Sequence, residues 1–179
     1  MSIFNHKVFI GLRVRIAEAD AAAHMAASPR VVGERLAHAV DAHVREAALG
    51  YYPPLDYFRG RGVLDEELIE AAENMGWLVS RLVREELGRR LRAVFSRVSF
   101  RSVQTVAFSM PSVRPGQKDA LERLVEHYTP TTVRVDLEMS LIQKRPNPEG
   151  LEHFARSVLL RWVEPAFEAV EVTSVHLIE

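Results

Sequence analysis

Apolar and polar residues alternate with period two in four stretches of the chain, the pattern typical of a strand with one buried face. The clearest stretch is 131–143, where Val133, Val135 and Leu137 alternate with charged residues. The other three stretches are residues 8–16, 98–110 and 167–178. Because strands covered on both faces read as continuous apolar runs, this alternation predicts a sheet packed by helices on one face only.

Helical periodicity fills the intervals between these strands. Ser28 and Pro29 suit the start of a helix, and Gly50 suits its end. The predicted helices are an alanine-rich segment at 18–27, then 29–49, 64–95, 116–128, and one that follows Asn147 and ends at Pro165. Together with the strands they predict a single α+β domain over residues 1–179. We expect two layers, with a four-stranded, largely antiparallel or mixed sheet and a ferredoxin-like element in the last part.

Composition excludes several classes of chemistry. The chain has 179 residues, a formal net charge of −1 and no cysteine. Disulfides, thiolate metal sites and thiol nucleophiles are therefore excluded. No signal-peptide pattern and no apolar run of membrane-spanning length is found, so we expect a cytoplasmic protein without a membrane partner. Arginine outnumbers lysine 20 to 3, and asparagine and glutamine total six, which fits a thermophile or a GC-rich genome.

An aromatic loop follows the second predicted helix. Its paired prolines and alternating glycines, from Gly50 to Gly62, are incompatible with a regular helix or strand. Large amphipathic side chains in such a loop indicate an interface with another copy or another protein, or packing against the loop's own domain. The predicted interface residues are Tyr51, Tyr52, Tyr57, Phe58, Arg59 and Arg61.

Basic residues gather towards the end of the long helix and just beyond it. They suit a phosphate-binding patch, but bases at a helix C-terminus also complement the helix dipole, and Glu86 with Arg90 is a favourable i, i+4 pair. The candidate nucleic-acid-binding residues are Arg81, Arg84, Arg92, Arg97 and Arg101.

A histidine with two acidic neighbours is the remaining candidate for chemistry. Glu34, His38 and Asp41 share one helical face, so His38 could act as a general base oriented by a carboxylate. The sequence has no repeated metal-ligand spacing, phosphate-binding loop or dinucleotide fingerprint, so no metal or cofactor is predicted.

Three functions follow from these features. The leading expectation is a non-enzymatic interaction or assembly subunit that forms a homo-oligomer or part of a larger complex. It would use the aromatic loop and the sheet edges, with strands 7–16 and 167–178 as the expected edges. The first alternative is a nucleic-acid-binding module that uses the arginine patch. The second is a small histidine-dependent enzyme.

Overall fold

The chain folds into two compact units, which are described separately. The computed structural model describes residues 4–25, 27–95, 97–109, 111–143, 150 and 153–178. Unit 1 comprises residues 1–16, 80–104 and 133–179, and unit 2 comprises residues 17–79 and 105–132. That all 179 residues act as a single domain stays a prediction.

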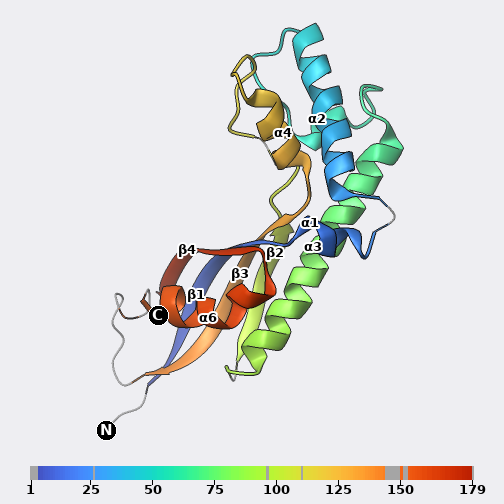
Figure 1. The fold of residues 1–179 in the computed structure, drawn as a ribbon. Coiled ribbons are helices and arrows are strands. Elements are labelled where there is room, and N and C mark those ends of the chain that lie inside the picture. The colour runs from blue at the N-terminus through green and yellow to red at the C-terminus, as the bar shows by residue number, and fades with distance from the viewer. Residues whose placement is uncertain are drawn as a thin grey trace. The chain divides into compact units, whose positions relative to one another are not determined.

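Unit 1 is built on the four predicted strands (Figure 1). They are β1 (Phe4–Arg15), β2 (Val98–Thr105), β3 (Thr132–Gln143) and β4 (Ala169–Ile178). They form one antiparallel sheet in the order β2-β3-β1-β4. The two-layer α+β class predicted from the alternating pattern is therefore confirmed.

The helices of unit 1 separate its strands along the chain. The C-terminal half of α3 (Glu66–Arg92) precedes β2, and the described residues before β4 include three short helical segments. These are a π-helical segment, η2 (Phe154–Leu159), then α6 (Leu160–Val163), then a 3₁₀ turn, η3 (Glu164–Ala166). With this strand order, unit 1 has the βαββαβ arrangement of ferredoxin-like folds. The sequence predicted such an element for the last part of the chain only. In the structure, its first strand is β1, near the N-terminus, and its other strands follow later in the chain.

The two central strands, β1 and β3, separate buried from polar residues. Ile10 and Leu12 of β1 and Leu137 of β3 are fully buried, as are Val83 and Leu87 of α3. We call the opposite side of the sheet the polar face. Its residues in three strands are Lys7, Phe9, Gly11 and Arg13 of β1, Arg134, Asp136, Glu138 and Ser140 of β3, and Ser174 and His176 of β4.

The prediction that residues 7–16 form an edge strand is wrong. β1 lies inside the sheet between β3 and β4, and the edge strands are β2 and β4. β1 pairs antiparallel with β4, with Phe9 opposite His176 and Arg13 opposite Glu171. Its continuous apolar side is consistent with the interior position, since both neighbouring strands extend the same buried face.

Unit 2 is helical. It contains α1 (Glu18–Ala22), α2 (Pro29–Glu46), the 3₁₀ turn η1 (Leu55–Phe58), the N-terminal half of α3, and α4 (Ala120–Tyr128). Its core joins α2, η1, α3 and α4, and includes the fully buried Leu36, Ile69 and Leu124. Gly33 lets α2 approach α4 closely, because a Cβ at this position would lie 3.0 Å from the Thr129 Cα.

Several element boundaries differ from the predicted ones. β2 ends at Thr105 and not near residue 110, and the next amide, that of Val106, donates to the Thr132 carbonyl. Phe108 then has a positive φ of 73°, which ends the extended path. Met110 and the predicted cap at Asn147 lie outside the described residues.

Candidate functional site

Two aromatic side chains of the predicted interface lie in the core of unit 2. Tyr52 is 2% exposed, and Phe58 is fully buried. The Tyr52 hydroxyl donates a 2.8 Å hydrogen bond to Asp41 Oδ1. Burial, followed by this hydrogen bond, raises the pKa of Tyr52 to about 12. These two side chains hold the loop to its own unit, which is the self-packing alternative.

The remaining interface candidates lie nearer the surface. The Arg61 guanidinium lies 4.1 Å from the centroid of the half-buried Tyr57 ring, a cation–π contact. Arg59 forms ion pairs with Asp56 and Glu73. Tyr51 is 48% exposed. Whether any of these residues contacts a partner stays a prediction, and Tyr51 is the loop tyrosine best placed to do so.

Asp41, the second acidic neighbour of His38, lies in a largely buried environment. Its side chain is largely buried, and it accepts a hydrogen bond from Tyr52 and forms a 2.9 Å ion pair with Arg45 Nε. Both carboxylate oxygens are thus engaged by groups other than His38. Whether Asp41 also orients His38 stays a prediction.

Glu34 and His38, by contrast, meet at a surface groove of unit 2. The groove has a volume of about 620 Å³. Apolar residues of α2 and of the start of α3 form much of its lining, with Arg35 and Asp65 among the polar residues. Glu34 forms a 3.2 Å ion pair with Arg30 through one of its carboxylate oxygens. A general-base role for His38 stays a prediction.

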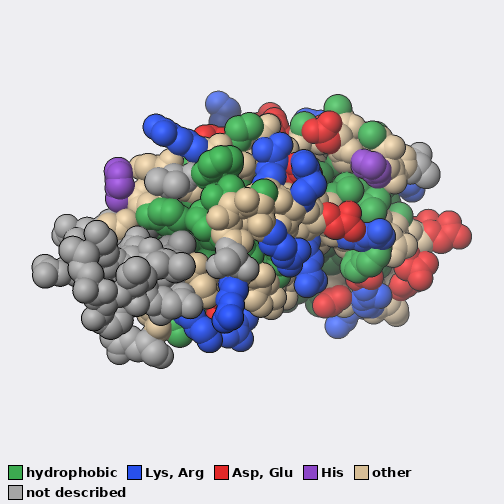
Figure 2. All heavy atoms as spheres, turned by 90° about the horizontal axis from the view of Figure 1, so that it is seen from below, with side chains coloured by type: hydrophobic (Ala, Val, Ile, Leu, Met, Phe, Trp, Pro, Cys, Tyr) green, Lys and Arg blue, Asp and Glu red, His purple; other side chains and the backbone are tan. Residues whose placement is uncertain are grey.

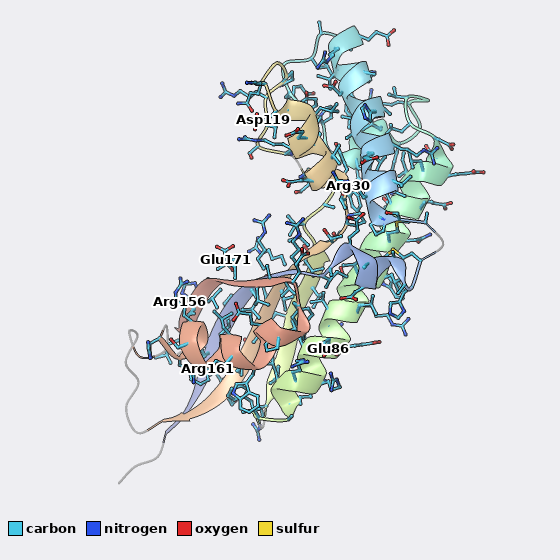
Figure 3. The ribbon with its side chains drawn as sticks, in the orientation of Figure 1. Arg30, Glu86, Asp119, Arg156, Arg161 and Glu171 are labelled. Carbon is cyan, nitrogen blue, oxygen red and sulfur yellow. The ribbon has the colours of Figure 1, made fainter. Side chains whose placement is uncertain are left out.

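Some arginines of the predicted patch form ion pairs with carboxylates. Arg81 Nε lies 3.0 Å from Glu85, and Arg101 pairs with Glu138 of β3. The favourable pair of Glu86 with Arg90 forms at 2.8 Å, and Arg89 also donates to Glu86. Glu86 lies on the C-terminal half of α3 (Figure 3), and these two arginines lower its pKa by hydrogen bonding.

Two arginines of α3 contact the ring of Phe100 in β2. The guanidinium carbons of Arg84 and Arg92 lie 5.6 and 5.8 Å from the centroid of its ring. Both distances fall within the range of cation–π attraction. Gly88 lies beside this contact: a Cβ there would be at ordinary van der Waals distance, 3.5 Å, from the Phe100 ring, and 3.0 Å from the end of the Arg92 side chain.

Three cationic side chains converge on a pocket of about 360 Å³ in unit 1. We call it the basic pocket. Lys7 comes from the start of β1, Arg92 from the end of α3, and Arg97 from the connection to β2. The remaining lining residues are Val98, Ser99, Glu138, Met139 and Ser140. The Ser140 amide donates to the Arg97 carbonyl, which holds the connection against β3.

The acidic residues on the polar face already have cationic partners. Glu138 pairs with Arg101, and Asp136 Oδ1 lies 3.9 Å from Arg134 Nε. In the described part of the chain, no carboxylate forms an ion pair with any of the three cations of the basic pocket. The pocket therefore has a local excess of positive charge, although the whole chain has a net charge of −1. Figure 2 shows basic side chains on the surface of the protein, with hydrophobic and acidic side chains between them.

Sequence reasoning found Arg92 and Arg97 but missed Lys7, Ser99 and Ser140. Lys7 is distant from the arginines along the chain, and only the position of β1 next to β3 brings it close to Ser140. No local spacing signals this meeting. The sequence contains one indication of it: Lys7 stands at the start of a predicted strand, on the same face as the alternating polar residues.

Among the residues that the structure describes, no group of three or more histidine or acidic side chains could hold a metal ion. Within the same residues, no helix combines the length and the apolar character needed to cross a membrane. No known protein family matches the sequence, and no curated protein or solved structure is significantly similar to this chain.

Proposed function

We propose that this protein binds nucleic acid, with the basic pocket as the phosphate-binding site. The observation that carries the proposal is the convergence of Lys7, Arg92 and Arg97 without carboxylate partners among the described residues. Guanidinium groups bind phosphate through paired hydrogen bonds, and a lysine adds a compact point charge. The hydroxyl groups of Ser99 and Ser140 supply further donors to phosphate oxygens.

The position of Arg92 supports this proposal. Its contact with Phe100 limits the conformations of its side chain at the pocket wall. A guanidinium that is already ordered loses less conformational freedom when it binds phosphate. The arginines that the sequence grouped together then have two roles: Arg92 and Arg97 bind phosphate, whereas Arg81 and Arg101 stabilise the fold through ion pairs.

Fluorescence anisotropy with a labelled single-stranded oligonucleotide tests the proposal. We expect the double variant Lys7→Ala, Arg97→Ala to bind at least about 10-fold more weakly, because each substitution removes a charge-assisted hydrogen bond to phosphate. The slope of log K against log salt should fall by about 0.7 for each phosphate that the variant no longer neutralises. Arg123→Ala is the control, since this exposed arginine of unit 2 pairs with Asp119. Equal binding by wild type and the double variant would refute the proposal.

A second candidate function is supported by the edge position of β4. This strand has ten residues, contains no proline or lysine, and pairs with β1 on one side only. Edge strands present unpaired backbone groups that can pair with another chain. We propose that two copies associate through β4, as an assembly subunit would.

Light scattering after size-exclusion chromatography tests this association. Thr173→Lys places a positive charge on the exposed edge, so it should shift a dimer towards monomer. Gln117→Lys, which adds the same charge to an exposed position of unit 2, should leave the mass unchanged. A wild-type protein that is monomeric at all accessible concentrations would exclude this function.

A further inference from the structure

Two aromatic rings lie side by side on the polar face of the sheet. Phe9 of β1 is directly opposite His176 of β4. Their ring centroids are 6.1 Å apart and their planes are inclined by 22°, so the rings are stacked. His176 is exposed and Phe9 is half-buried, so part of both rings is accessible to a ligand.

The setting of Phe9 differs from that of a core phenylalanine. Val8 and Ile10, its neighbours in β1, are buried on the opposite side of the sheet. Phe9 instead shares its side with Lys7, Gly11 and the polar residues of β3. The half-buried Phe9 ring therefore leaves part of its surface open to a ligand on this side of the sheet.

Gly11 contributes to the shape of the same face. The pairing of β1 with β4 is irregular between Gly11 and Leu12. A Cβ at Gly11 would lie 2.5 Å from the Ser174 hydroxyl and 2.6 Å from the Thr173 hydroxyl. Because Gly11 has no side chain, the hydroxyl groups of Thr173 and Ser174 can lie close to β1 beside the rings.

The stacked rings also lie close to the basic pocket along β1. Lys7, which lines the pocket, precedes Phe9 by two residues and points to the same side. In a strand this spacing corresponds to about 7 Å. A phosphate in the pocket and a flat ring on Phe9 could therefore belong to the same or adjacent units of one ligand.

We infer that Phe9 and His176 form a stacking platform for a nucleobase, and that the nucleic acid bound in the basic pocket is single-stranded. The inference rests on the proposed function and specifies its ligand. Bases in a duplex are already stacked and paired, whereas an unpaired base can lie on an aromatic ring of a sheet. The two rings then supply stacking, and the basic pocket supplies charge from Lys7, Arg92 and Arg97.

A comparison of the binding of two polyanions distinguishes base stacking from the attraction between charges. A mixed-sequence single-stranded RNA presents bases and phosphates, while inorganic polyphosphate of similar charge has no bases. Phe9→Leu keeps an apolar side chain but removes the ring, so it should weaken RNA binding by about 5- to 100-fold. Its affinity for polyphosphate and its salt slope should equal those of wild type. Lys7→Ala, Arg97→Ala should weaken the binding of both ligands.

The controls address folding and the general loss of an aromatic group. Trp162→Leu removes an aromatic side chain that is 49% exposed on α6, so it should bind RNA as wild type does. His176→Ala provides a second variant of the platform, should Phe9→Leu lower the melting temperature. RNA affinity unchanged in both platform variants would overturn the inference, as would equal affinity of wild type for the same sequence as a duplex. Failure of wild type to bind either polyanion would refute the proposed function itself.

Discussion

At the scale of single residues, several carboxylates in this chain form hydrogen bonds or ion pairs with side chains close to them in the sequence. Asp41 accepts a hydrogen bond from Tyr52 on one oxygen and pairs with Arg45 through the other. The hydrogen bond fixes the loop residue Tyr52 in the core. Glu86 similarly accepts hydrogen bonds from Arg89 at 2.6 Å and from Arg90 at 2.8 Å. Such pairs decide which charged side chains are available for binding.

Glu86 should make unfolding depend on pH. Its pKa in the folded chain is lowered from 4.5, chiefly by the hydrogen bonds from Arg89 and Arg90. A lowered folded pKa contributes stability above pH 4.5, and this contribution is lost as the pH falls through the folded value. Glu86→Gln should therefore be less stable than wild type at about pH 7, and the difference should shrink as the pH falls below the ordinary pKa of a glutamate.

Urea unfolding followed by circular dichroism at about pH 7 and about pH 3, on either side of the ordinary glutamate pKa, measures this difference. Glu70→Gln, at an exposed position on the same helix, is the control. A difference in unfolding free energy between wild type and Glu86→Gln that stays constant across this pH range would contradict a lowered pKa of Glu86.

At the scale of elements, the packing of α2 on α4 depends on the absence of a side chain at Gly33. A Cβ there would lie 2.3 Å from the Thr129 hydroxyl and 3.0 Å from the Thr129 backbone nitrogen. Gly33→Ala should lower the stability of unit 2 by about 1–3 kcal/mol through this clash. The gain in helix propensity, about 1 kcal/mol, acts in the opposite direction.

Thermal unfolding of Gly33→Ala and of Gly50→Ala checks this prediction. No atom lies within 4 Å of a Cβ at Gly50, so the control changes the same residue type without a clash. Gly33→Ala should melt at a lower temperature than the control. A higher melting temperature would show that helix propensity outweighs packing.

The sequence predicts elements well where one face is buried. The alternation of Val133, Val135 and Leu137 with polar residues located β3 within one residue of its observed start. It could not reveal the order of the strands, because an internal and an edge strand of a sheet covered on one side have the same pattern. β1 was therefore placed wrongly at an edge.

At the scale of the whole molecule, the chain forms two compact units. Leu124 lies in the core of unit 2, and Leu137 is buried in unit 1. Leu124→Ala should cost about 2–5 kcal/mol. The decrease in amide protection should be concentrated in residues 17–79 and 105–132, whereas Leu137→Ala should act mainly on the other segments.

Hydrogen exchange measured by mass spectrometry distinguishes these patterns. Helix α3 belongs to both units, so its middle turns should respond to both variants. A uniform decrease in protection throughout the chain in either variant would show instead that the two units unfold as one.

The candidate site could be predicted only in part, for a reason that also lies at this scale. Arg92 and Arg97 are close in sequence and form a visible basic cluster. Lys7 joins them, and Phe9 meets His176, only through strand pairing between distant segments. The tyrosines of the loop, conspicuous in the sequence, are partly core residues because the loop folds back on α2.

The pairing of β1 with β4 has a consequence for synthesis on the ribosome. β1 is translated first among the strands, while the neighbour that completes its hydrogen bonding is translated last. All segments of unit 2 leave the exit tunnel before β4 does, so its helical core can form early. Until β4 emerges, β1 has an open edge, and the nascent chain is then most exposed to aggregation and to capture by chaperones.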